Sequence, residues 1–192
     1  MEMIDFFNKH AEHWDDKIKE HDPIREAVAA LCGAGENSKV LDIACGTGVM
    51  FPELLKLNVK ELVGIDIADK MVEIARKKFS KTSNLRIECK NLFEFEEGGF
   101  DIALMYNAYP HFINKEAMIE QVAKLLVQGG RFTVVHGAGR QVINHCHGNV
   151  PSDISVKLGE AKEEAKHFEK WFNIDVTFDT PYFYMISGTV KK

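Results

Sequence analysis

A glycine turn between two apolar runs is the feature that most constrains the fold of this chain. The run at residues 40–43 leads into the sequence G-T-G at 46–48, and a helix-like pattern follows over 48–57. Glycine lets the backbone approach a ligand where a Cβ would clash, and the free N–H groups at a helix start bind polar groups. Eighteen positions past the second glycine, another apolar run ends at Asp66, where an acid can accept hydrogen bonds from both hydroxyls of a ribose. The spacing predicts a nucleoside-binding unit.

Two better-known glycine motifs do not fit the residues that follow the turn. The dinucleotide fingerprint needs a third small residue where this chain has Phe51, and no G-K-[ST] follows as a phosphate-binding loop requires. Asp42 lies four residues before Gly46, at the expected tip of the first strand. An acid there would repel a pyrophosphate and attract an ammonium group. The turn therefore favours a nucleoside that carries an amino acid tail.

The motifs of this chain resemble those of the class I S-adenosylmethionine-dependent methyltransferases, most of all their small-molecule, ubiquinone-biosynthesis-like branch. The segments that carry the resemblance are VLDIACGTG at 40–48, VGIDIADKM at 63–71, FDIALMYNAYPHF at 100–112 and LLVQGGRFTVVH at 125–136, and FFNKHAEHWD at 6–15 is similar to the N-terminal lid of the family. The resemblance implies an α/β fold with a doubly wound, mostly parallel seven-stranded sheet, a C-terminal antiparallel hairpin and a Rossmann-like core. It also implies S-adenosyl-L-methionine as the cofactor and a small-molecule acceptor.

Hydrophobic periodicity predicts alternating strands and helices, which is typical of a parallel sheet covered on both faces. Apolar residues at steps of three and four predict a helix over 3–20, and Asp22-Pro23 opens a second helix over 23–32. The elements expected after them are strands 39–43, 61–65, 84–88, 100–106 and 130–136 and helices 48–57, 69–79 and 114–127. Gly129-Gly130 is expected to end the last of these helices.

The tail is expected to contain a helix over 159–170 and two strands, 172–178 and 182–190, whose short connection implies an antiparallel pair. Residues 1–192 are interpreted as one methyltransferase domain. Its predicted parts are an N-terminal helical lid at 1–33, a cofactor-binding core at 38–136, a substrate-side insertion at 137–170 and the hairpin at 171–192.

The resemblance implies a role for each cofactor-binding residue. Asp42 and the turn would hold the methionine part, Asp66 the ribose, and the apolar Ile67 and Met71 the adenine, although Met71 also suits a helix core. Asn91 stands where the family usually has an acid, and its carbonyl oxygen can accept the same adenine hydrogen bond. Trp14 either closes over the site or packs its helix on the sheet. The predicted cofactor set is Trp14, Asp42, Ala44, Gly46, Gly48, Asp66, Ile67, Met71, Asn91, Leu92 and Asn107.

His111 and His136 are the candidate catalytic residues, because they follow strands whose carboxyl ends flank the cofactor in the family's strand order. Each is interpreted as a general base or a hydrogen-bonding group for the acceptor, and a purely structural His136 is the alternative. No metal is expected. If residues 139–147 are extended, His136, His145 and His147 become possible metal ligands. If the segment is helical, the side chains of His145 and His147 point in different directions, and a polar helix face contains Arg140, Asn144 and His147.

Composition narrows the function classes. The chain has 24 basic and 29 acidic side chains, a net charge of −5, and no basic run longer than residues 76–78, which argues against a nucleic acid partner. Its four cysteines show no C-x-x-C spacing, and no apolar run reaches membrane-spanning length, so a cytoplasmic monomer or homodimer without a membrane partner is expected. The alternatives to methyl transfer are a metal-assisted or other non-methylating enzyme and a non-catalytic S-adenosylmethionine-binding protein.

Overall fold

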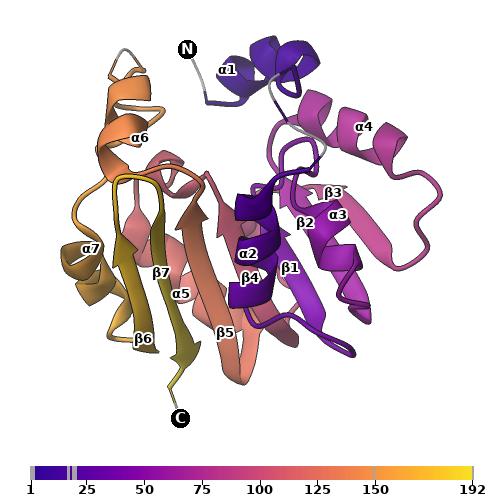
Figure 1. Ribbon diagram of the computed structural model, residues 1–192. Helices are drawn as coiled ribbons and strands as arrows, with labels where there is room; N and C mark the ends of the chain where they lie inside the picture. Colours follow the sequence, from indigo (N-terminus) through magenta and orange to yellow (C-terminus); the bar gives the residue numbers. More distant parts are fainter. Residues whose placement is uncertain (1–2, 17, 19–20, 149, 192) are drawn as a thin grey trace.

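A seven-stranded, mostly parallel sheet organises the computed structural model, which describes residues 3–16, 18, 21–148 and 150–191 (Figure 1). The strand order is β3-β2-β1-β4-β5-β7-β6, and β7 runs antiparallel to both of its neighbours. The strands are β1 (Lys39–Ile43), β2 (Glu61–Asp66), β3 (Leu85–Cys89), β4 (Phe100–Tyr106), β5 (Leu126–His136), β6 (Phe172–Asp179) and β7 (Tyr184–Val190). The predicted doubly wound sheet with its C-terminal antiparallel hairpin is confirmed.

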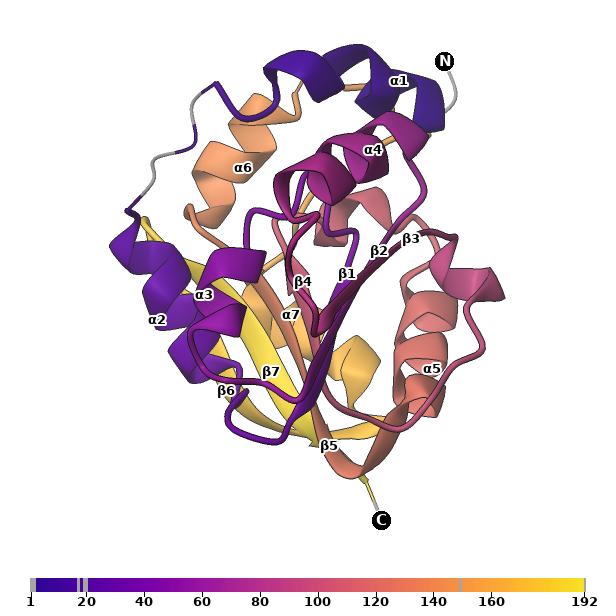
Figure 2. The ribbon, with the colours of Figure 1, turned by 90° about the vertical axis from the view of Figure 1, so that its right-hand side faces the viewer.

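Helices cover both faces of the sheet, as the edge-on view shows (Figure 2). Packing of α2, α3 and α4 on one face contributes one hydrophobic cluster, and packing of α5 and α7 on the other contributes a second. The α-helices are α1 (Met3–His10), α2 (Pro23–Leu31), α3 (Phe51–Leu55), α4 (Asp69–Lys78), α5 (Lys115–Leu125), α6 (Arg140–Cys146) and α7 (Ala161–Phe168). Short 3₁₀ helices are η1 (Ala11–His13), η2 (Leu92–Glu94) and η3 (Tyr109–His111).

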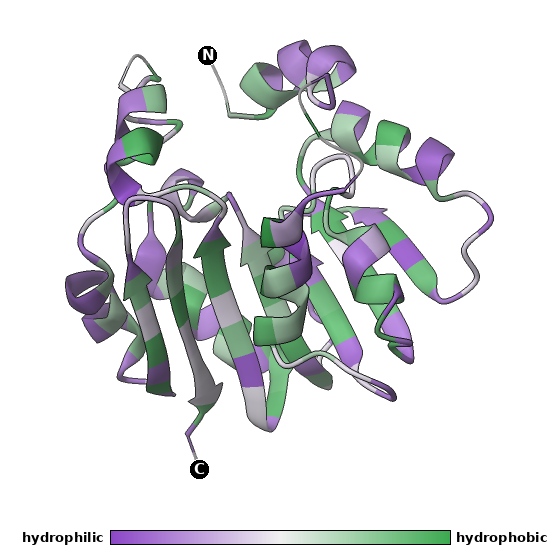
Figure 3. Ribbon diagram, viewed as in Figure 1, coloured by the Kyte–Doolittle hydropathy of each residue, from purple (hydrophilic) through white to green (hydrophobic). Residues whose placement is uncertain are grey.

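The central strands are apolar on both faces, which is why the chain buries them between two helix layers (Figure 3). In β1, Leu41 and Ile43 belong to the cluster beneath α5 and α7, whereas Val40 belongs to the cluster beneath α2 and α3. Successive side chains of a strand point to opposite faces, so this one short strand joins both clusters. At the carboxyl ends of the parallel strands, α1 and α6 lie beyond the sheet rather than against it (Figure 1).

Two predicted helices are shorter in the structure. The helix expected over 3–20 ends at His10 and continues only as η1; positions 17, 19 and 20 of that prediction lie outside the described residues. The helix expected from residue 48 begins at Phe51. Gly46 and Gly48 have φ angles of +54° and +82°, which a right-handed helix cannot contain, so the turn extends further than the apolar pattern indicates.

The predicted role of Gly129-Gly130 as the end of a helix is wrong. Helix α5 ends at Leu125, and both glycines lie inside β5, which begins at Leu126. Strand β5 pairs with β4 through an irregular register at this point, and Gly129 has a φ of +75°. A Cβ on Gly130 would lie 2.9 Å from the carbonyl oxygen of Val127. The glycines therefore allow a bulge in the strand, a local geometry that propensity alone does not distinguish from a helix end.

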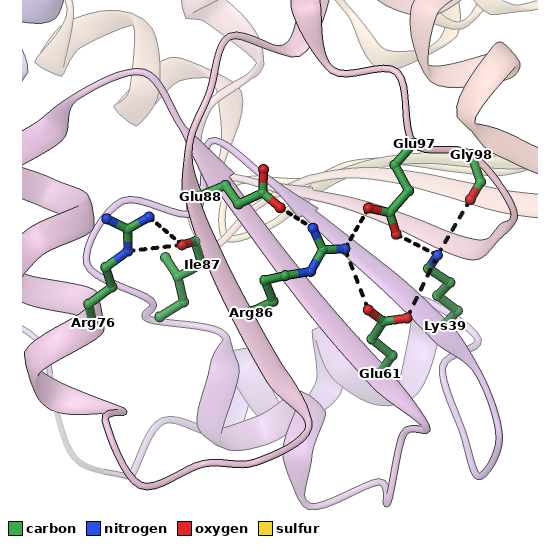
Figure 4. Close-up of polar contacts among 8 residues, drawn as sticks. All are labelled: Lys39, Glu61, Arg76, Arg86, Ile87, Glu88, Glu97 and Gly98. Atoms are coloured by element: carbon green, nitrogen blue, oxygen red, sulfur yellow. Dashed lines mark hydrogen bonds and ion pairs between the residues drawn. The ribbon is translucent and has the colours of Figure 1, made fainter.

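Charged side chains form hydrogen bonds and ion pairs at the β3 edge of the sheet (Figure 4). The guanidinium of Arg76, from α4, donates to the carbonyl oxygen of Ile87 over 2.9 and 2.7 Å, so a carbonyl of the edge strand has a partner. Near the base of the strands, Arg86 contacts Glu97 at 2.6 Å. These pairs are partly exposed, so each contributes little to the free energy of unfolding. The full network consists of Lys39, Glu61, Arg86, Glu88 and Glu97.

Candidate active site at the carboxyl edge of the sheet

A cavity of about 1020 Å³ lies at the carboxyl ends of the parallel strands, where open α/β sheets bind their ligands. Its lining comes from the carboxyl ends of the five parallel strands and the segments that follow them, from α1 and the segment after it, from the start of α2 and from α6. Every residue predicted to bind the cofactor or to act in catalysis lines this cavity except Gly48. The structure thus brings together residues that span more than half of the sequence.

Asp42 is the most unusual group in the cavity. Its side chain is 1% exposed, and neither carboxylate oxygen has a hydrogen-bond partner among the described residues. Burial, with a further contribution from the charge of Asp66, raises the pKa of Asp42 to about 8. A buried carboxylate without a partner is costly, and a cationic ligand would relieve that cost. The group fits the ammonium of an amino acid tail, as its position in the sequence indicates.

Asp66 connects the glycine turn to the end of β2. One carboxylate oxygen accepts from the backbone N–H of Gly46 at 2.8 Å, and the other accepts from the N–H of Ala68 at 2.8 Å. Burial raises the pKa of Asp66 in spite of these hydrogen bonds, which act in the opposite direction. Each carboxylate oxygen has a second lone pair. Asp66 can therefore hold the turn in place and still accept hydrogen bonds from a ribose.

The two glycines of the turn have different physical roles. Gly46 lines the cavity, and a Cβ added there would come no closer than 4.0 Å to Trp14. Gly48 does not line the cavity, and its Cβ would lie 2.4 Å from the ring of Phe51. Both need a positive φ, which Ala44 also adopts at +55°. Glycine at 48 is thus explained by packing inside the turn and not by the approach of a ligand.

At the far end of the cavity, Ile67, Met71, Asn91 and Leu92 lie together after β2 and β3. Met71 is 2% exposed and packs with Ala68, so it belongs to a small core cluster as well as to the cavity wall. The side-chain oxygen of Asn91 accepts from the N–H of Phe93 at 3.1 Å and caps η2. One lone pair of that oxygen remains for an adenine amino group.

The N-terminal segment covers the cavity and is held by polar contacts. Asp15 accepts from the hydroxyl of Thr47 at 2.5 Å and pairs with Lys78 at 2.7 Å. Asn8 donates to Asp69 at 2.6 Å, at the start of α4. Trp14 lines the cavity and is 41% exposed, so it is not simply packed into the core. The segment also packs on α4 through Phe7 and Ala11, so both polar and apolar contacts join it to the rest of the fold.

We expect the exchange of backbone amides in residues 3–16 to slow when S-adenosylhomocysteine binds, because Trp14 would gain a ligand contact on its cavity side. Ordering of a segment by a ligand is a common switching mode. Hydrogen exchange followed by mass spectrometry measures the effect, with α5 as the control because it lies on the far face of the sheet. Equal exchange in 3–16 with and without the ligand would assign Trp14 to packing alone.

His111 and His136 line the cavity at the carboxyl ends of β4 and β5, whereas the adenine-side residues follow β2 and β3 on the other side of β1. The Nδ1 of His111 is 2.9 Å from the carbonyl oxygen of Ile154, and a carbonyl only accepts, so Nδ1 carries the proton and Nε2 has a free lone pair. His136 is 2% exposed, and its Nε2 has no partner among the described residues. Burial lowers the pKa of His111 to about 4 and that of His136 to about 3, so both imidazoles are neutral at pH 7.

His147 is a third imidazole in this part of the cavity, and the sequence placed it on a polar helix face rather than among the catalytic candidates. It follows α6, its ring lies 5.1 Å from that of His111, and its Nδ1 is 2.9 Å from the hydroxyl of Ser155. Burial lowers its pKa. Two neighbouring residues thus hold the two histidines, since Ile154 contacts His111 and Ser155 contacts His147. The only sequence signal for this contact was the helical phase of 139–147.

The alternatives left open for 139–147 are resolved by α6, which is a helix. His145 is exposed and does not line the cavity, so it diverges from His147. Of the three residues on the expected polar face, only His147 lines the cavity. Arg140 pairs with Asp179 at 2.9 Å and Asn144 bonds the backbone of Leu158, both away from the cavity. Within the described residues, no three His, Cys, Asp or Glu side chains are arranged to hold a metal ion.

Asn107 joins the tips of the two strands that lead to the histidines. Its φ is +57°, and its side-chain oxygen accepts from the N–H of Gly137 at 3.0 Å. This bond links the end of β4 to the end of β5, and Asn107 also lines the cavity. Asn107 thus lies in the cavity wall where the two strand ends meet, and its contact with the cofactor stays a prediction.

Comparison with known proteins finds methyltransferases, which is the family that the sequence motifs resemble. A family model described as a methyltransferase domain matches residues 40–130. An uncharacterized methyltransferase-like protein of Schizosaccharomyces pombe is 26% identical over 136 residues, which cover 71% of this chain and 50% of that protein. A ubiquinone biosynthesis O-methyltransferase of Neisseria meningitidis is 29% identical over 139 residues, which cover 65% and 57%. The N-methyltransferase NodS of Bradyrhizobium japonicum, solved with S-adenosylhomocysteine, superposes with a TM-score of 0.78 at 12% identity, over all of both chains.

The matched region contains the parts of the site that a cofactor would contact. It begins in β1 and ends within β5, so it includes the glycine turn, Asp66 and the segment after β4. The chain spans about half the length of the curated relatives that it matches. In the described part of the chain, no helix combines the length and apolar character needed to cross a bilayer. The family model, the relatives and the fold together show that this chain is similar to the class I S-adenosylmethionine-dependent methyltransferases.

Proposed function

We propose that this protein transfers a methyl group from S-adenosylmethionine to a small-molecule acceptor. The observation that carries the proposal is Asp42, a buried carboxyl with no hydrogen-bond partner among the described residues, directly before a glycine turn that lines a large cavity. When bound, the cofactor supplies a methyl group on a sulfonium, which is already a good leaving group. The residues of the chain therefore need only to hold, orient and enclose the reactants.

The residues of the cofactor half have four tasks. Asp42 attracts the ammonium group of the amino acid tail, and Asp66 accepts from the ribose hydroxyls while it holds the turn. Ile67 and Met71 present apolar surface to the adenine. Trp14 closes over the turn and excludes water from the reacting centre. These assignments are proposals that follow from the position of each side chain in the cavity.

At the other end, His111 orients the acceptor through its free Nε2 lone pair. Its low pKa makes the imidazole a weak base, so its main contribution is a hydrogen bond to the nucleophile. His136 is the second candidate for this contact, since its Nε2 lacks a partner among the described residues. The acceptor is thus placed between the two histidines and the methionine end of the cofactor.

The proposal is tested by binding and then by turnover. Calorimetry should show binding of S-adenosylmethionine and S-adenosylhomocysteine and none of NAD. A screen with thiols, phenols, amines and carboxylates should then find an acceptor that yields S-adenosylhomocysteine. Binding without turnover on any acceptor favours a non-catalytic S-adenosylmethionine-binding protein, and turnover without methyl transfer favours another enzyme on this fold. Failure of both cofactor forms to bind would refute the proposal.

Replacing Asp42 by Asn should stabilise the protein in the absence of cofactor, and more so at higher pH. The pKa of Asp42 is about 8 in the folded protein and 3.8 in the unfolded chain. Between these two pH values, the carboxyl is protonated in the folded protein and ionised in the unfolded chain. The free energy of unfolding of the wild type therefore falls as the pH rises through this window, by at most about 1.4 kcal/mol per pH unit. The free energy of unfolding of the variant does not fall in this way. Between pH 5.5 and 7.5, we therefore expect the difference in the free energy of unfolding to grow by about 2 kcal/mol in favour of the variant.

Urea unfolding at both pH values measures this difference. Asp101→Asn is the matched control, because Asp101 accepts from the backbone of Lys39 at the other end of β1. The Asp42→Asn variant should also bind S-adenosylhomocysteine more weakly, because the ammonium loses its charged partner. Parallel pH profiles for the wild type and the variant would show that Asp42 is not a buried titrating group.

Replacing His111 by Leu should lower turnover about tenfold, which corresponds to the loss of one hydrogen bond to the acceptor. A base with a pKa of about 4 is unprotonated above that pH, so wild-type turnover should not fall between pH 7 and 5.5 through titration of His111. Formation of S-adenosylhomocysteine with an acceptor from the screen measures both effects. His145→Leu is the control, since His145 is exposed and outside the cavity. A turnover that halves near pH 6.5 would contradict the neutral state assigned to His111.

A further inference from the structure

The acceptor half of the cavity is built without charged side chains. Its described lining comes from α1 and from residues 111–114 and 136–147, and none of these lining residues is Asp, Glu, Lys or Arg. Phe7, Phe112, Val142 and Ile143 supply apolar surface. The polar groups include the three imidazoles of His111, His136 and His147, which we call the histidine wall. This half of the cavity is therefore uncharged whenever the imidazoles are neutral.

The charged lining groups lie elsewhere. Asp42 and Asp66 line the cofactor half, and Lys90 lies beside the predicted adenine site after β3. Asp22 and Arg25 line the cavity at the start of α2, where they pair with each other at 3.6 Å. A charged acceptor at the histidine wall would thus find no lining group of opposite charge among the described residues of that half. Burying a charge without a partner is strongly unfavourable.

The histidine wall also has a defined hydrogen-bonding character. The proton of His111 is on Nδ1, because that atom faces the carbonyl of Ile154, so Nε2 can only accept. Nε2 of His136 is buried and has no partner among the described residues. A buried imidazole nitrogen of this kind needs a hydrogen-bonding partner from the ligand, and the hydroxyl or thiol of an acceptor can supply one. The low pKa values of both imidazoles agree with an environment in which a positive charge is not stabilised.

We propose that the histidine wall takes an uncharged acceptor that presents an O–H or S–H group, such as a phenol or an alkyl thiol, and rejects carboxylates and ammonium groups. The inference rests on the proposed function and narrows its substrate class. Methylation of such an acceptor forms an O–CH₃ or S–CH₃ bond and breaks the C–S bond of the sulfonium, whose electron pair stays on sulfur. The O–H or S–H group donates a hydrogen bond to Nε2 of His111 while it reacts, and its proton is released to water.

Four probes of similar size test the inference with the full chain at pH 7 and saturating S-adenosylhomocysteine. Phenylmethanethiol and 4-methylphenol are neutral at this pH, and benzoate and benzylammonium are charged. Calorimetry or ligand-detected NMR measures their binding. We expect each neutral probe to bind at least tenfold more tightly than either ion. With S-adenosylmethionine in place of S-adenosylhomocysteine, only the thiol or the phenol should be methylated.

A pair of neighbouring lysine substitutions on α6 provides the matched control. Val142 lines the cavity and is 50% exposed, so Val142→Lys places a cation beside the histidine wall with little risk to folding. Gln141 is exposed and lies outside this cavity. We expect Val142→Lys to tighten benzoate binding at least fivefold and Gln141→Lys to leave it unchanged.

The outcomes separate the two proposals. If S-adenosylhomocysteine binds but benzoate or benzylammonium binds as tightly as the neutral probes, the inference is overturned and the cofactor site remains. The same conclusion follows if none of the four probes binds, or if the two lysine variants behave alike. If S-adenosylhomocysteine itself does not bind, the proposed function fails, and the inference fails with it.

Discussion

Replacing Asp66 by Ala is expected to lower the affinity for S-adenosylhomocysteine about a hundredfold. Two hydrogen bonds from ribose hydroxyls to a carboxylate are lost, and each contributes roughly 1.5–3 kcal/mol. The structure adds a second reason, because the same carboxylate holds the N–H groups of Gly46 and Ala68. Its removal would leave these two backbone donors without that acceptor and loosen the glycine turn. Titration calorimetry with the purified variant measures the loss.

Two further variants separate the ribose contact from general damage to the fold. Asp66→Asn keeps one acceptor oxygen and should fall between the wild type and the alanine variant. Glu61→Gln alters the opposite end of the same strand, where Glu61 belongs to the charged network at the base of the sheet, and should leave cofactor affinity unchanged. If Asp66→Ala folds and binds S-adenosylhomocysteine like the wild type, Asp66 is not the ribose ligand.

Replacing Gly48 by Ala is expected to lower the free energy of unfolding by about 3 kcal/mol. A φ of +82° costs an alanine roughly 1–2 kcal/mol, and overpacking adds about 1–3 kcal/mol. The overlap is severe, since the new Cβ would lie 2.4 Å from the ring of Phe51 and 3.0 Å from that of Phe79. The ring of Phe51 is fully buried and has little room to move. Denaturant unfolding measures the change.

Gly99→Ala is a matched control for this substitution. Gly99 has the same φ of +82°, but no atom lies within 4 Å of the position of its Cβ, so only the backbone term of about 1 kcal/mol remains. Equal losses at the two positions would remove the packing explanation for Gly48. Because Gly48 does not line the cavity, the folded variant should bind S-adenosylhomocysteine within about threefold of the wild type. A loss far beyond that would restore a direct role in cofactor binding.

The cofactor half of the site could be predicted from the sequence because its parts are local. Asp42, the glycine turn and Asp66 fall within two consecutive parallel strands and the connection between them. In a right-handed β-α-β unit, the carboxyl ends of such strands meet at one edge, so spacing along the chain is enough to place the groups together. The alternation of apolar strands and helices predicts the layered fold for the same reason.

Local detail at element ends was less predictable. The start of α3 depends on the positive φ angles of Gly46 and Gly48, and the position of Gly129 depends on how β5 pairs with β4. Both depend on residues that the fold brings together, such as Phe79 beside Gly48 and Phe100 across the sheet. Hydrophobic periodicity contains no information on such pairings, so the predicted boundaries were wrong there by several residues.

In the acceptor half, the sequence indicated His111 and His136, and tertiary structure decided the rest. His111, His136 and His147 come from η3, β5 and the end of α6, and only the helical phase of α6 turns His147 toward His111 while His145 faces solvent. The proton position on His111 depends on a carbonyl at Ile154, 43 residues further on. Sequence determined that this chain forms a nucleoside-binding sheet, because those contacts repeat along neighbouring strands. Burial and long-range hydrogen bonds determined which histidines share a cavity and in which state, because these depend on the folding of the whole chain.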